Sequence, residues 1–494
     1  MANTPILPCL DFPSIRIIPS SSSSHSLDSP KFEIPPTILP HLETASRHLH
    51  NHQTVALPTE TVYGLAASSL DPAAIQSVYR IKKRPADNPL ILHVSSLNML
   101  RQVIPRDYQI SELYMALITS FWPGPLSLLF PAIDPPPSPA PQTNAIRMPS
   151  HPLALALIHH SNLPLSAPSA NSSGRPSPTQ AQHVYNDLNG SEGLGCILDG
   201  GDCGVGVEST VINGLGWRKG GEGIVDVLRP GGLGIEKIKE VVGRVDGKEG
   251  LTRILLHGKP WIANKSPKRG EQSFTRIPKE EDGPKINGSS ESSVIDKVRS
   301  IALPPSTPGM KYRHYSPRVP VYLIKPNTIF PRPDNLPQHA ESSAQAVLRQ
   351  ISQRTLSSSS GNGKKRIGVL HFDNSPLYSQ LSSSVDEVED THLMPVSLGQ
   401  DASSAAQRLF AGMLTLERIP PSQDEVDGDG KIGVDAILIE GCSDEGLGLA
   451  VMERVTKAVG GGGVVGDVKD DEDGERQGGA AEGNTFWVDV TGDI

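Results

Sequence analysis

The chain has 494 residues, a formal charge of −9, 47 glycines, 45 prolines and only 4% aromatic residues. No apolar run reaches about eighteen residues, which excludes a transmembrane helix. Four separated cysteines without a CxxC pair argue against a disulfide scaffold or a cysteine-based zinc site, and favour a reducing compartment such as the cytoplasm. Much of the negative charge lies at the C-terminus, so the overall acidity says little about binding partners.

The first part of the sequence predicts a disordered segment followed by one domain. Residues 1–37 contain runs of serine and proline and predict a disordered extension. Over residues 38–245, short apolar runs alternate with segments of helical apolar spacing, which predicts an α/β domain. The expected strands are 54–58, 89–94, 126–130, 196–199 and 208–213, and the expected helices are 72–82, 108–122 and 178–188.

A second, smaller domain is predicted beyond a polar stretch. Residues 246–305 predict a disordered basic linker, and 306–318 a connector to the next domain. Residues 319–460 predict a Rossmann-like domain with a parallel sheet, because strands again alternate with helical segments. The glycine run and the acidic residues of 461–494 predict a disordered tail. The expected elements of the second domain are strands at 319–324, 366–372 and 434–440 and a helix at 402–418.

Polar side chains follow predicted strands and helices of the first domain. Thr61 lies in PTETVYGL directly after a strand, where open α/β sheets bind ligands, although an ordinary loop explains the motif equally well. Lys82, Lys83 and Arg84 form a basic cluster that suits phosphate. A solvated helix end is the commoner reason for such a cluster.

A serine-rich segment, SAPSANSSGRPSP at residues 166–178, directly precedes a predicted helix. Its hydroxyl and backbone N–H groups could hold phosphate without a Walker lysine, and a flexible loop is the alternative. The sequence contains no GxxxxGK[ST], no HExxH and no convincing Ser-His-Asp pattern. P-loop and hydrolase functions therefore receive no support.

Several motifs in chain order carry a family resemblance. PTETVYGL, KKRPADNPL, FWPGPLSLLF, AIRMPSHP, SAPSANSSGRPSPT, ILDGG, GVESTVI and VLRPGG closely resemble the signature blocks of the YrdC-type L-threonylcarbamoyladenylate synthases. PGMKYRHYSP and VDAILIEGCSDEGLGLAVMERVTKA resemble the two-domain form of that family. The resemblance implies a YrdC-like twisted, open mixed sheet with helices, followed by a smaller Rossmann-like parallel α/β domain.

The resemblance also implies a nucleotidyltransferase that uses ATP, L-threonine and bicarbonate. The threonine amine would become a carbamate, whose oxygen attacks the α-phosphorus of ATP to give threonylcarbamoyl-AMP and pyrophosphate. A downstream threonylcarbamoyl transferase complex would then modify the adenosine next to the anticodon of tRNA. Mg²⁺ is expected with ATP, held mostly by phosphate and water.

Site residues follow from the family's positions. The threonine-binding positions of the family fall on Thr61, His93, Arg147, Ala167 and Ser209. Its ATP-binding positions fall on Arg84, Asn88, Thr143, Ser169, Ser177 and Arg229, with Lys82 as a neighbouring candidate. Tyr312 and His314 are expected near the nucleotide, because their connector resembles a segment that folds over it. Nucleotidyl transfer needs positioning and charge neutralisation above all, so no general base and no metal-ligating residue is assigned.

Two other functions are compatible with parts of the sequence. Trp261 lies among Arg253, Lys259, Lys265, Lys268 and Arg269, a basic stretch that could bind double-stranded RNA or tRNA without catalysis. A weak affinity for RNA is expected of the enzyme as well. A hydrogenase-maturation carbamoyltransferase also contains a YrdC-like domain, but it carries paired cysteine zinc motifs that this chain lacks.

Overall fold

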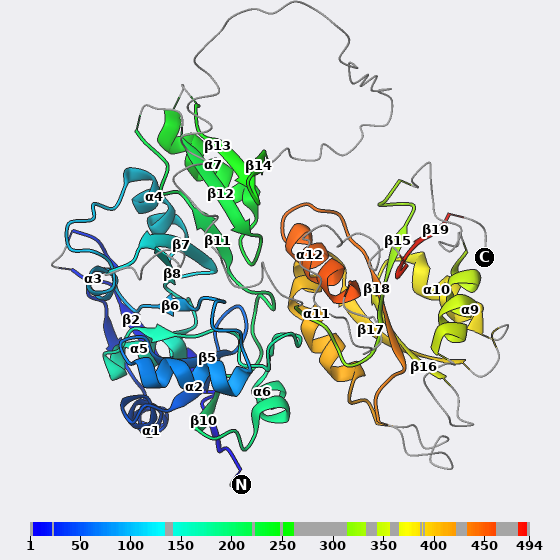
Figure 1. The fold of residues 1–494 in the computed structure, drawn as a ribbon, viewed down its shortest axis with the longest axis horizontal. Helices are drawn as coiled ribbons and strands as arrows, with labels where there is room; N and C mark the ends of the chain where they lie inside the picture. Colours follow the sequence, from blue (N-terminus) through cyan, green and yellow to red (C-terminus); the bar gives the residue numbers. More distant parts are fainter. Residues whose placement is uncertain are drawn as a thin grey trace, which may run out of the picture.

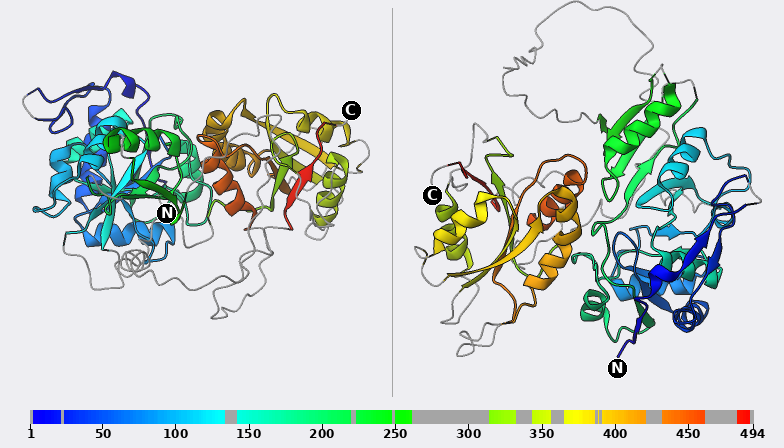
Figure 2. Two further views of the ribbon diagram at one scale, coloured as in Figure 1. Left: turned by 90° about the horizontal axis from the view of Figure 1, so that it is seen from above. Right: turned by 180° about the vertical axis from the view of Figure 1, so that it is seen from behind.

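The computed structural model describes residues 3–21, 24–133, 142–219, 223–247, 250–260, 314–331, 343–355, 365–385, 388, 391–420, 432–460 and 483–491. Two α/β domains lie side by side (Figures 1 and 2). The first contains the blue to green elements of Figure 1, and the second contains the yellow-green to red ones.

The first domain is built on one twelve-stranded mixed sheet. Strand β4 pairs with β10 in parallel and with β5 in antiparallel orientation. In order across the sheet, the strands are β1 (Ile6–Pro8), β10 (Leu194–Asp199), β4 (Thr54–Leu57), β5 (Gly64–Ser68), β9 (Leu165–Ser166), β6 (Ile91–His93), β8 (Thr143–Arg147), β7 (Leu126–Pro131), β11 (Thr210–Asn213), β12 (Ile224–Arg229), β13 (Arg253–Leu256) and β14 (Lys259–Pro260).

Helices pack against both faces of this sheet because alternate strand residues point in opposite directions. Val55 and Leu57 of β4 belong to the apolar core that contains the buried residues of α1 and α5, whereas Ala56 between them belongs to the core of α2 and α6. The helical segments of this domain are η1 (Phe12–Ser14), α1 (Leu39–His50), α2 (Pro72–Lys82), α3 (Leu97–Gln102), α4 (Glu112–Phe121), α5 (Pro152–Ser161), α6 (Ala181–Leu188) and α7 (Ile235–Asp246).

The second domain has a five-stranded sheet in which every recorded pair is parallel. Helices α9 and α10 cover one face and α11 and α12 the other, with a separate apolar core under each pair. The strands in sheet order are β17 (Thr391–Gly399), β16 (Lys365–Phe372), β18 (Ala436–Glu440), β15 (Val321–Pro326) and β19 (Thr485–Val488), and the helices are α9 (Ala344–Thr355), α10 (Pro376–Ser383), α11 (Ala402–Leu416) and α12 (Gly448–Val459).

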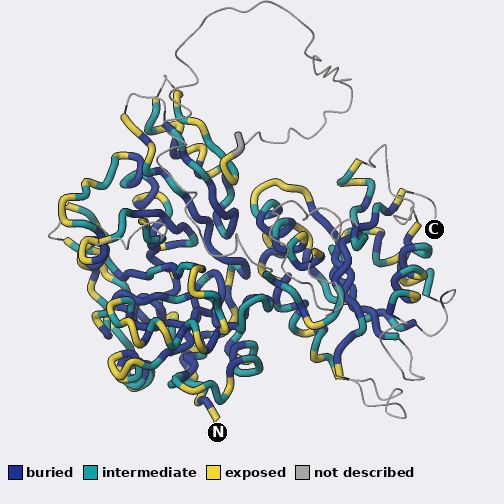
Figure 3. The backbone as a smooth tube through the Cα atoms, viewed as in Figure 1, coloured by how far each residue is buried: buried dark blue, intermediate teal, exposed yellow. Residues whose placement is uncertain are grey.

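Helices α11 and α12 face the first domain, and the two domains share apolar core there (Figures 1 and 3). Val62 and Val207 of the first domain lie in the same buried cluster as Phe410 of α11. Gly206, the residue before Val207, also lies against α11. Its φ is +78°, and a Cβ there would lie 2.3 Å from the Cα of Gln407 in that helix. Only glycine allows this close approach of loop and helix.

The predicted fold class is confirmed: a large mixed sheet is followed by a smaller parallel one. Helix α2 has the bounds that its apolar spacing predicted. The helix predicted from Pro178 begins instead at Ala181, after an extended Gln180. None of the described helices is long and apolar enough to cross a membrane.

The prediction of a disordered extension over 1–37 is wrong. Strand β1 pairs in parallel with β10 at the edge of the large sheet, and β2 (Arg16–Ile18) forms a hairpin with β3 (Lys31–Glu33). Three-residue strands carry too few alternating positions to stand out from a serine- and proline-rich background.

Two predicted domain boundaries also need correction. Strands β13 and β14 extend the first sheet to Pro260, so no linker begins at 246. In the predicted acidic tail, β19 pairs with β15, and Phe486 and Val488 are buried. The rest of the predicted linker, the connector before His314 and residues 461–482 lie outside the described residues.

Candidate active site

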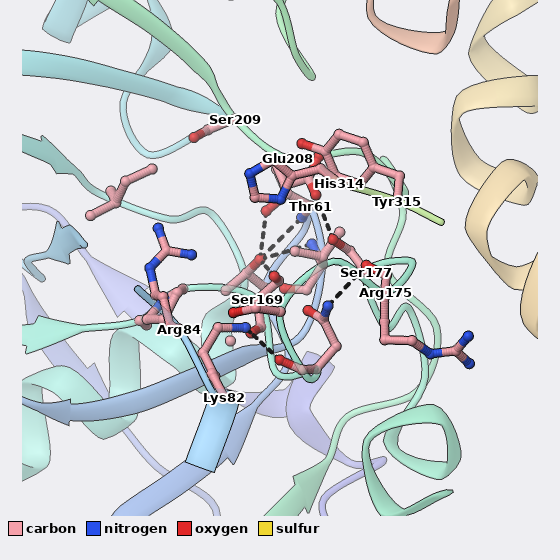
Figure 4. Close-up of a pocket in the computed structure, with 18 of the residues that line it drawn as sticks. Thr61, Lys82, Arg84, Ser169, Arg175, Ser177, Glu208, Ser209, His314 and Tyr315 are labelled. Carbon is pink, nitrogen blue, oxygen red and sulfur yellow. Dashed lines mark hydrogen bonds between the residues drawn. The ribbon is translucent and has the colours of Figure 1, made fainter. Parts of the chain in front are cut away.

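A pocket opens in the first domain next to the second, with an empty space of about 700 Å³ including its mouth. Its walls come from the β4–β5 loop, the end of α2, strands β6 and β8, the serine-rich loop after β9, the start of β11, the end of β12 and the residues preceding β15 (Figure 4).

One wall, called here the carboxylate side, is organised around Arg147 at the end of β8. Its Nη1 donates to Thr61 Oγ1 at 3.0 Å and its Nη2 to Glu60 Oε2 at 2.9 Å. Glu60 also accepts from the backbone N–H of Ser150 at 3.1 Å, which fixes the carboxylate and hence the guanidinium. Among the described residues, the buried Arg147 Nε has no hydrogen-bond partner. This wall therefore presents an oriented cation, whose Nε and the neighbouring Glu60 Oε1 lack a partner among the described residues.

His93 lies beside Arg147 because parallel strands β6 and β8 pair these two residues directly. Burial, with the positive charge of Arg147, lowers the pKa of His93 to about 3. The imidazole is therefore neutral near pH 7 and serves as a hydrogen-bonding group, not as a second cation.

The opposite wall, called here the phosphate side, begins at the end of α2. That helix starts at Pro72, capped by Asp71, and ends at Lys82. The next residue, Lys83, is left-handed with φ 51°, which turns the chain into Arg84. Arg84 donates from Nη2 to Asn88 Oδ1 at 2.6 Å and from Nε to the Asn88 carbonyl at 3.0 Å. Burial lowers the pKa of Arg84 to about 10, so the side chain remains a cation near neutrality.

Lys82 reaches the pocket but is engaged by the backbone. Its Nζ donates to the carbonyl of Asn171 at 2.6 Å and also to the carbonyl of Ser169. Burial lowers its pKa well below the ordinary lysine value. Lys82 thus holds the serine-rich loop in place, close to Arg84 (Figure 4).

Ser209, expected at the threonine, and Arg229, expected at the nucleotide, lie together in this pocket. Arg229 donates from Nε and Nη2 to the Ser209 carbonyl at 3.1 and 2.9 Å, and from Nη2 to Ser209 Oγ at 3.2 Å. Ser209 Oγ also lies 2.8 Å from Ser127 Oγ in β7. Neighbouring strands therefore fix this serine between two polar partners.

The remaining wall contains Ser177, Glu208, His314 and Tyr315 (Figure 4). Ser177 Oγ donates to Glu208 Oε1 at 2.5 Å. Burial disfavours ionisation of Glu208, but Arg454, Arg229 and the serine hydroxyl together lower its pKa to about 2. Burial and nearby cations, Arg84 first, lower the pKa of His314 to about 4, so its ring is neutral near pH 7.

The structure brings most of the predicted site residues into this one pocket. Lining residues among those expected are Thr61, Lys82, Arg84, His93, Arg147, Ala167, Ser169, Ser177, Ser209, Arg229 and His314. Their individual assignments to threonine or ATP stay predictions.

Three of the expected residues are not among the lining. Asn88 lies behind Arg84 and accepts its hydrogen bonds, so it supports the cation instead of facing the pocket. Thr143 pairs with Pro131 at the start of β8, at the end of the strand away from Arg147. Tyr312 lies outside the described residues.

Sequence reasoning missed other lining residues, notably Glu208, Tyr315 and Arg175. Glu208 lies in GVEST, where an acidic residue directly before a buried strand was a usable signal. Tyr315 is adjacent to the predicted His314. Arg175 pairs with Glu417, just after α11, at 2.7 Å between Nη1 and Oε1, a contact that local sequence does not reveal.

Comparisons with known proteins agree with this architecture. Residues 47–231 match the family described as telomere recombination, and residues 286–460 match the family described as the C-terminal domain of threonylcarbamoyl-AMP synthase. The threonylcarbamoyl-AMP synthase of Schizosaccharomyces pombe is 37% identical over 469 residues, which cover 89% of this chain and 93% of the relative. That of Bacillus subtilis is 34% identical over 85% of this chain and 94% of its own length.

A solved structure is similar over the same extent. The crystal structure of Pyrococcus abyssi Sua5 complexed with L-threonine superimposes with a TM-score of 0.56 and 31% sequence identity, covering 85% of this chain and 94% of that one. Both domains, their order and the length of the relatives are thus matched. The chain belongs to the threonylcarbamoyl-AMP synthase family.

Proposed function

We propose that this protein is an L-threonylcarbamoyladenylate synthase, which makes threonylcarbamoyl-AMP and pyrophosphate from L-threonine, bicarbonate and ATP. The observation that carries the proposal is the oriented Arg147, with a free buried Nε, in the same pocket as Arg84 and Arg229. A pocket of this kind suits an amino-acid carboxylate at one wall and a polyphosphate at the other. The L-threonine complex of the Pyrococcus abyssi relative supports the same assignment.

The carboxylate side would bind and orient threonine. Arg147 would receive the threonine carboxylate in a charge-assisted hydrogen bond, while Thr61 and the neutral His93 hydrogen-bond its other polar groups. The amine, once carboxylated by bicarbonate, carries the carbamate oxygen that attacks the α-phosphorus. Holding the carbamate toward the nucleotide is the main contribution of this wall, because proximity lowers the entropic cost of the reaction.

The phosphate side would bind ATP and stabilise the leaving pyrophosphate. Arg84 and Arg229 neutralise charge that develops as the bond between the α-phosphorus and its bridging oxygen breaks. We expect Mg²⁺ to enter with ATP and to supply further charge neutralisation. The carboxylates Glu60 and Glu208 are each engaged by an arginine, which supports an ion held by phosphate oxygens and water.

The test is incubation of the full chain with ATP, L-threonine and ¹⁴C-bicarbonate. Proposed activity gives a labelled adenylate and pyrophosphate release that depends on both threonine and bicarbonate. Serine in place of threonine measures how far the pocket distinguishes the extra methyl group. Pyrophosphate release without threonine, or no labelled product, contradicts the proposal.

The product would serve a downstream threonylcarbamoyl transferase complex that modifies tRNA, in the cytoplasm. The alternative of a non-catalytic RNA-binding module rests on the basic stretch around Trp261, most of which lies outside the described residues. Such a module would bind tRNA and release no pyrophosphate. The enzyme is favoured because the cations of the pocket converge on one concave space.

A further inference from the structure

We infer that Arg454, in helix α12 of the second domain, is a positioning residue for the nucleotide half of the pocket, acting through Glu208 on the Ser177 hydroxyl. Its ATP-binding readout rests on the proposed function, but its hydrogen-exchange readout does not. The inference assigns the second domain a specific task in a pocket whose other walls come from the first domain and the residues before β15.

Arg454 is fully engaged by protein groups from both domains. Its Nε and Nη2 donate to Glu208 Oε2 at 3.0 and 2.9 Å, and its Nη1 donates to the carbonyls of Pro230 at 2.6 Å and Ala450 at 3.1 Å. The residue is 1% exposed and does not line the pocket. Any influence on a ligand must therefore pass through a neighbour of Arg454: Glu208, the chain around Pro230 or the ring of Tyr315.

Glu208 transmits that influence because its second oxygen faces the pocket. Glu208 Oε1 accepts the hydroxyl proton of Ser177 at 2.5 Å. Because the Ser177 hydroxyl proton is donated to Glu208, the hydroxyl can only accept hydrogen bonds from a ligand. Ser177 should therefore accept from a ribose hydroxyl, an amine or a metal-bound water, and should not donate to a phosphate oxygen.

The second domain also contacts the loop of Glu208 and the neighbouring segment before β15. Gly206 lies against the backbone of α11, where a Cβ would come within 2.4 Å of the Ala406 carbonyl oxygen. Tyr315, at the pocket, has its ring 5.6 Å from the Arg454 guanidinium and 5.2 Å from the ring of Phe410. These contacts orient the Arg454–Glu208 pair, so it is more than an incidental contact between domains.

Loss of Arg454 would leave a buried carboxylate without its main cation. Such a group is protonated or turns toward solvent, since an unpaired charge in the interior is strongly unfavourable. Either change frees the Ser177 proton and alters the hydrogen-bonding character of the nucleotide wall. In the part of the chain that the structure describes, the hydrogen bonds of Arg454 go to Glu208, Pro230 and Ala450, so the carboxylate side, with Arg147 and Glu60, should keep its geometry.

The first experiment measures ATP and threonine affinities separately by calorimetry for the full-length Arg454→Gln protein. We expect about tenfold weaker ATP binding and threonine binding within about twofold of the unchanged protein. Arg418→Ala is the matched control, because it removes an interdomain hydrogen bond, 2.9 Å to the Asn186 carbonyl, outside this pocket. A folded Arg454→Gln protein with unchanged ATP affinity overturns the inference.

The second experiment separates positioning from general stabilisation. If Arg454 acts through Ser177, then Arg454→Gln should weaken ATP binding much less in a Ser177→Ala background than alone. Additive losses overturn the inference. If Arg454→Gln fails to fold, Arg454→Lys is the second variant. Lysine keeps the charge but lacks the planar guanidinium that pairs with Glu208. A folded Arg454→Lys protein with unchanged ATP affinity also overturns the inference.

Hydrogen exchange of residues 173–178 gives a readout that needs no activity. Arg454→Gln or Arg454→Lys should raise exchange there, while Arg418→Ala should not; unchanged exchange in both Arg454 variants counts against the inference. If the unchanged protein makes no labelled adenylate, the proposed function fails, yet the exchange result still decides the role of Arg454. If it makes the adenylate and both Arg454 variants match it in affinity and exchange, the inference alone fails.

Discussion

The two sides of the pocket are built in different ways. The carboxylate side draws Thr61, His93 and Arg147 from strand ends and a strand-to-strand loop of one sheet, and its ion pair joins Glu60 to Arg147 within that domain. Around Ser177 and Glu208, by contrast, the pocket depends on Arg454 from the second domain and on Tyr315. The ion pair of the carboxylate side lies within the first domain, whereas the wall of Ser177 and Glu208 requires docking of two domains.

This difference indicates how the two substrates should respond to damage. A mutation of Arg454 should reach the nucleotide first, because its guanidinium donates to Glu208 and, through that carboxylate, fixes the Ser177 hydroxyl. A mutation at the carboxylate side should affect threonine and leave ATP nearly untouched. Three predictions test this separation through ligand affinities and a fourth tests the neutral histidines of the pocket, beginning with the largest expected effect.

Arg147→Ala should reduce threonine affinity severely while ATP still binds. Removing a buried, charge-assisted partner costs roughly 2–5 kcal/mol, and it also leaves Glu60 without its cation. Calorimetric titration with each ligand measures the split. Arg101→Ala is a matched control, since Arg101 pairs with Asp28 outside the pocket. Equal loss of both ligands would mean that the two sides are not separate.

Arg84→Ala should weaken ATP binding by about 1.5–3 kcal/mol, the range for hydrogen bonds to charged groups. Threonine affinity should stay close to its original value, because Arg84 bonds Asn88 and Pro89 on the other wall. Arg80→Ala is the control: Arg80 lies in the last turn of α2, just before Arg84 in the chain, and pairs with Glu192 at an exposed position. ATP affinity unchanged in Arg84→Ala would remove this arginine from the nucleotide site.

His93 and His314 line the pocket as neutral imidazoles. We expect acid to lower the free energy of unfolding, because both become protonated when the chain unfolds. Burial holds the pKa of His93 at about 3 and that of His314 at about 4. Below pH of about 6.5 the unfolded chain takes up protons that the folded protein does not. The free energy of unfolding should therefore fall as pH drops toward 4, by up to about 2 kcal/mol per histidine at pH 5.

Urea unfolding at several pH values measures this slope. His151→Asn removes another buried imidazole, of pKa about 4, away from the pocket, and asparagine can still cap α5. The variant should show a shallower slope between pH 6.5 and 5. A stability that does not vary with pH over that interval would show that these imidazoles are protonated in the folded protein.

Asn88→Ala and Thr143→Ala should have the smallest effects and should differ from each other. Asn88→Ala removes one acceptor of Arg84, so ATP affinity should fall by about 0.5–1.5 kcal/mol. Thr143→Ala should stay within about 0.5 kcal/mol, because the pocket does not include it. A large loss of ATP affinity in Thr143→Ala would place this residue at the nucleotide after all.

The fold was predictable wherever a strand or helix is long enough to show its period. Buried runs such as TVALP and the spacing of 72–82 identified β4 and α2. Strands β1 and β19 were not found, because their stability comes from pairing with distant strands and not from local pattern. The motifs of the first domain likewise predicted most of the pocket lining.

Contacts between distant segments could not be predicted in this way. Asn88 was expected at the nucleotide, yet it supports Arg84 from behind, and a motif does not say which side chain faces the ligand. The partnership of Glu208 with Arg454 depends on how two domains dock. No spacing within either motif encodes that packing.

Strand β1 has a consequence for handling the protein. It pairs with β10 at the edge of the large sheet, where Ile6 lies opposite Ile197 and Cys9 is buried. Removing the first dozen residues as a supposed flexible tail would expose the hydrogen-bonding edge of β10, and an uncovered apolar edge recruits strands from other molecules. A trimmed protein could retain both sides of its pocket and still aggregate on concentration, because the N-terminal segment is the cover of that edge.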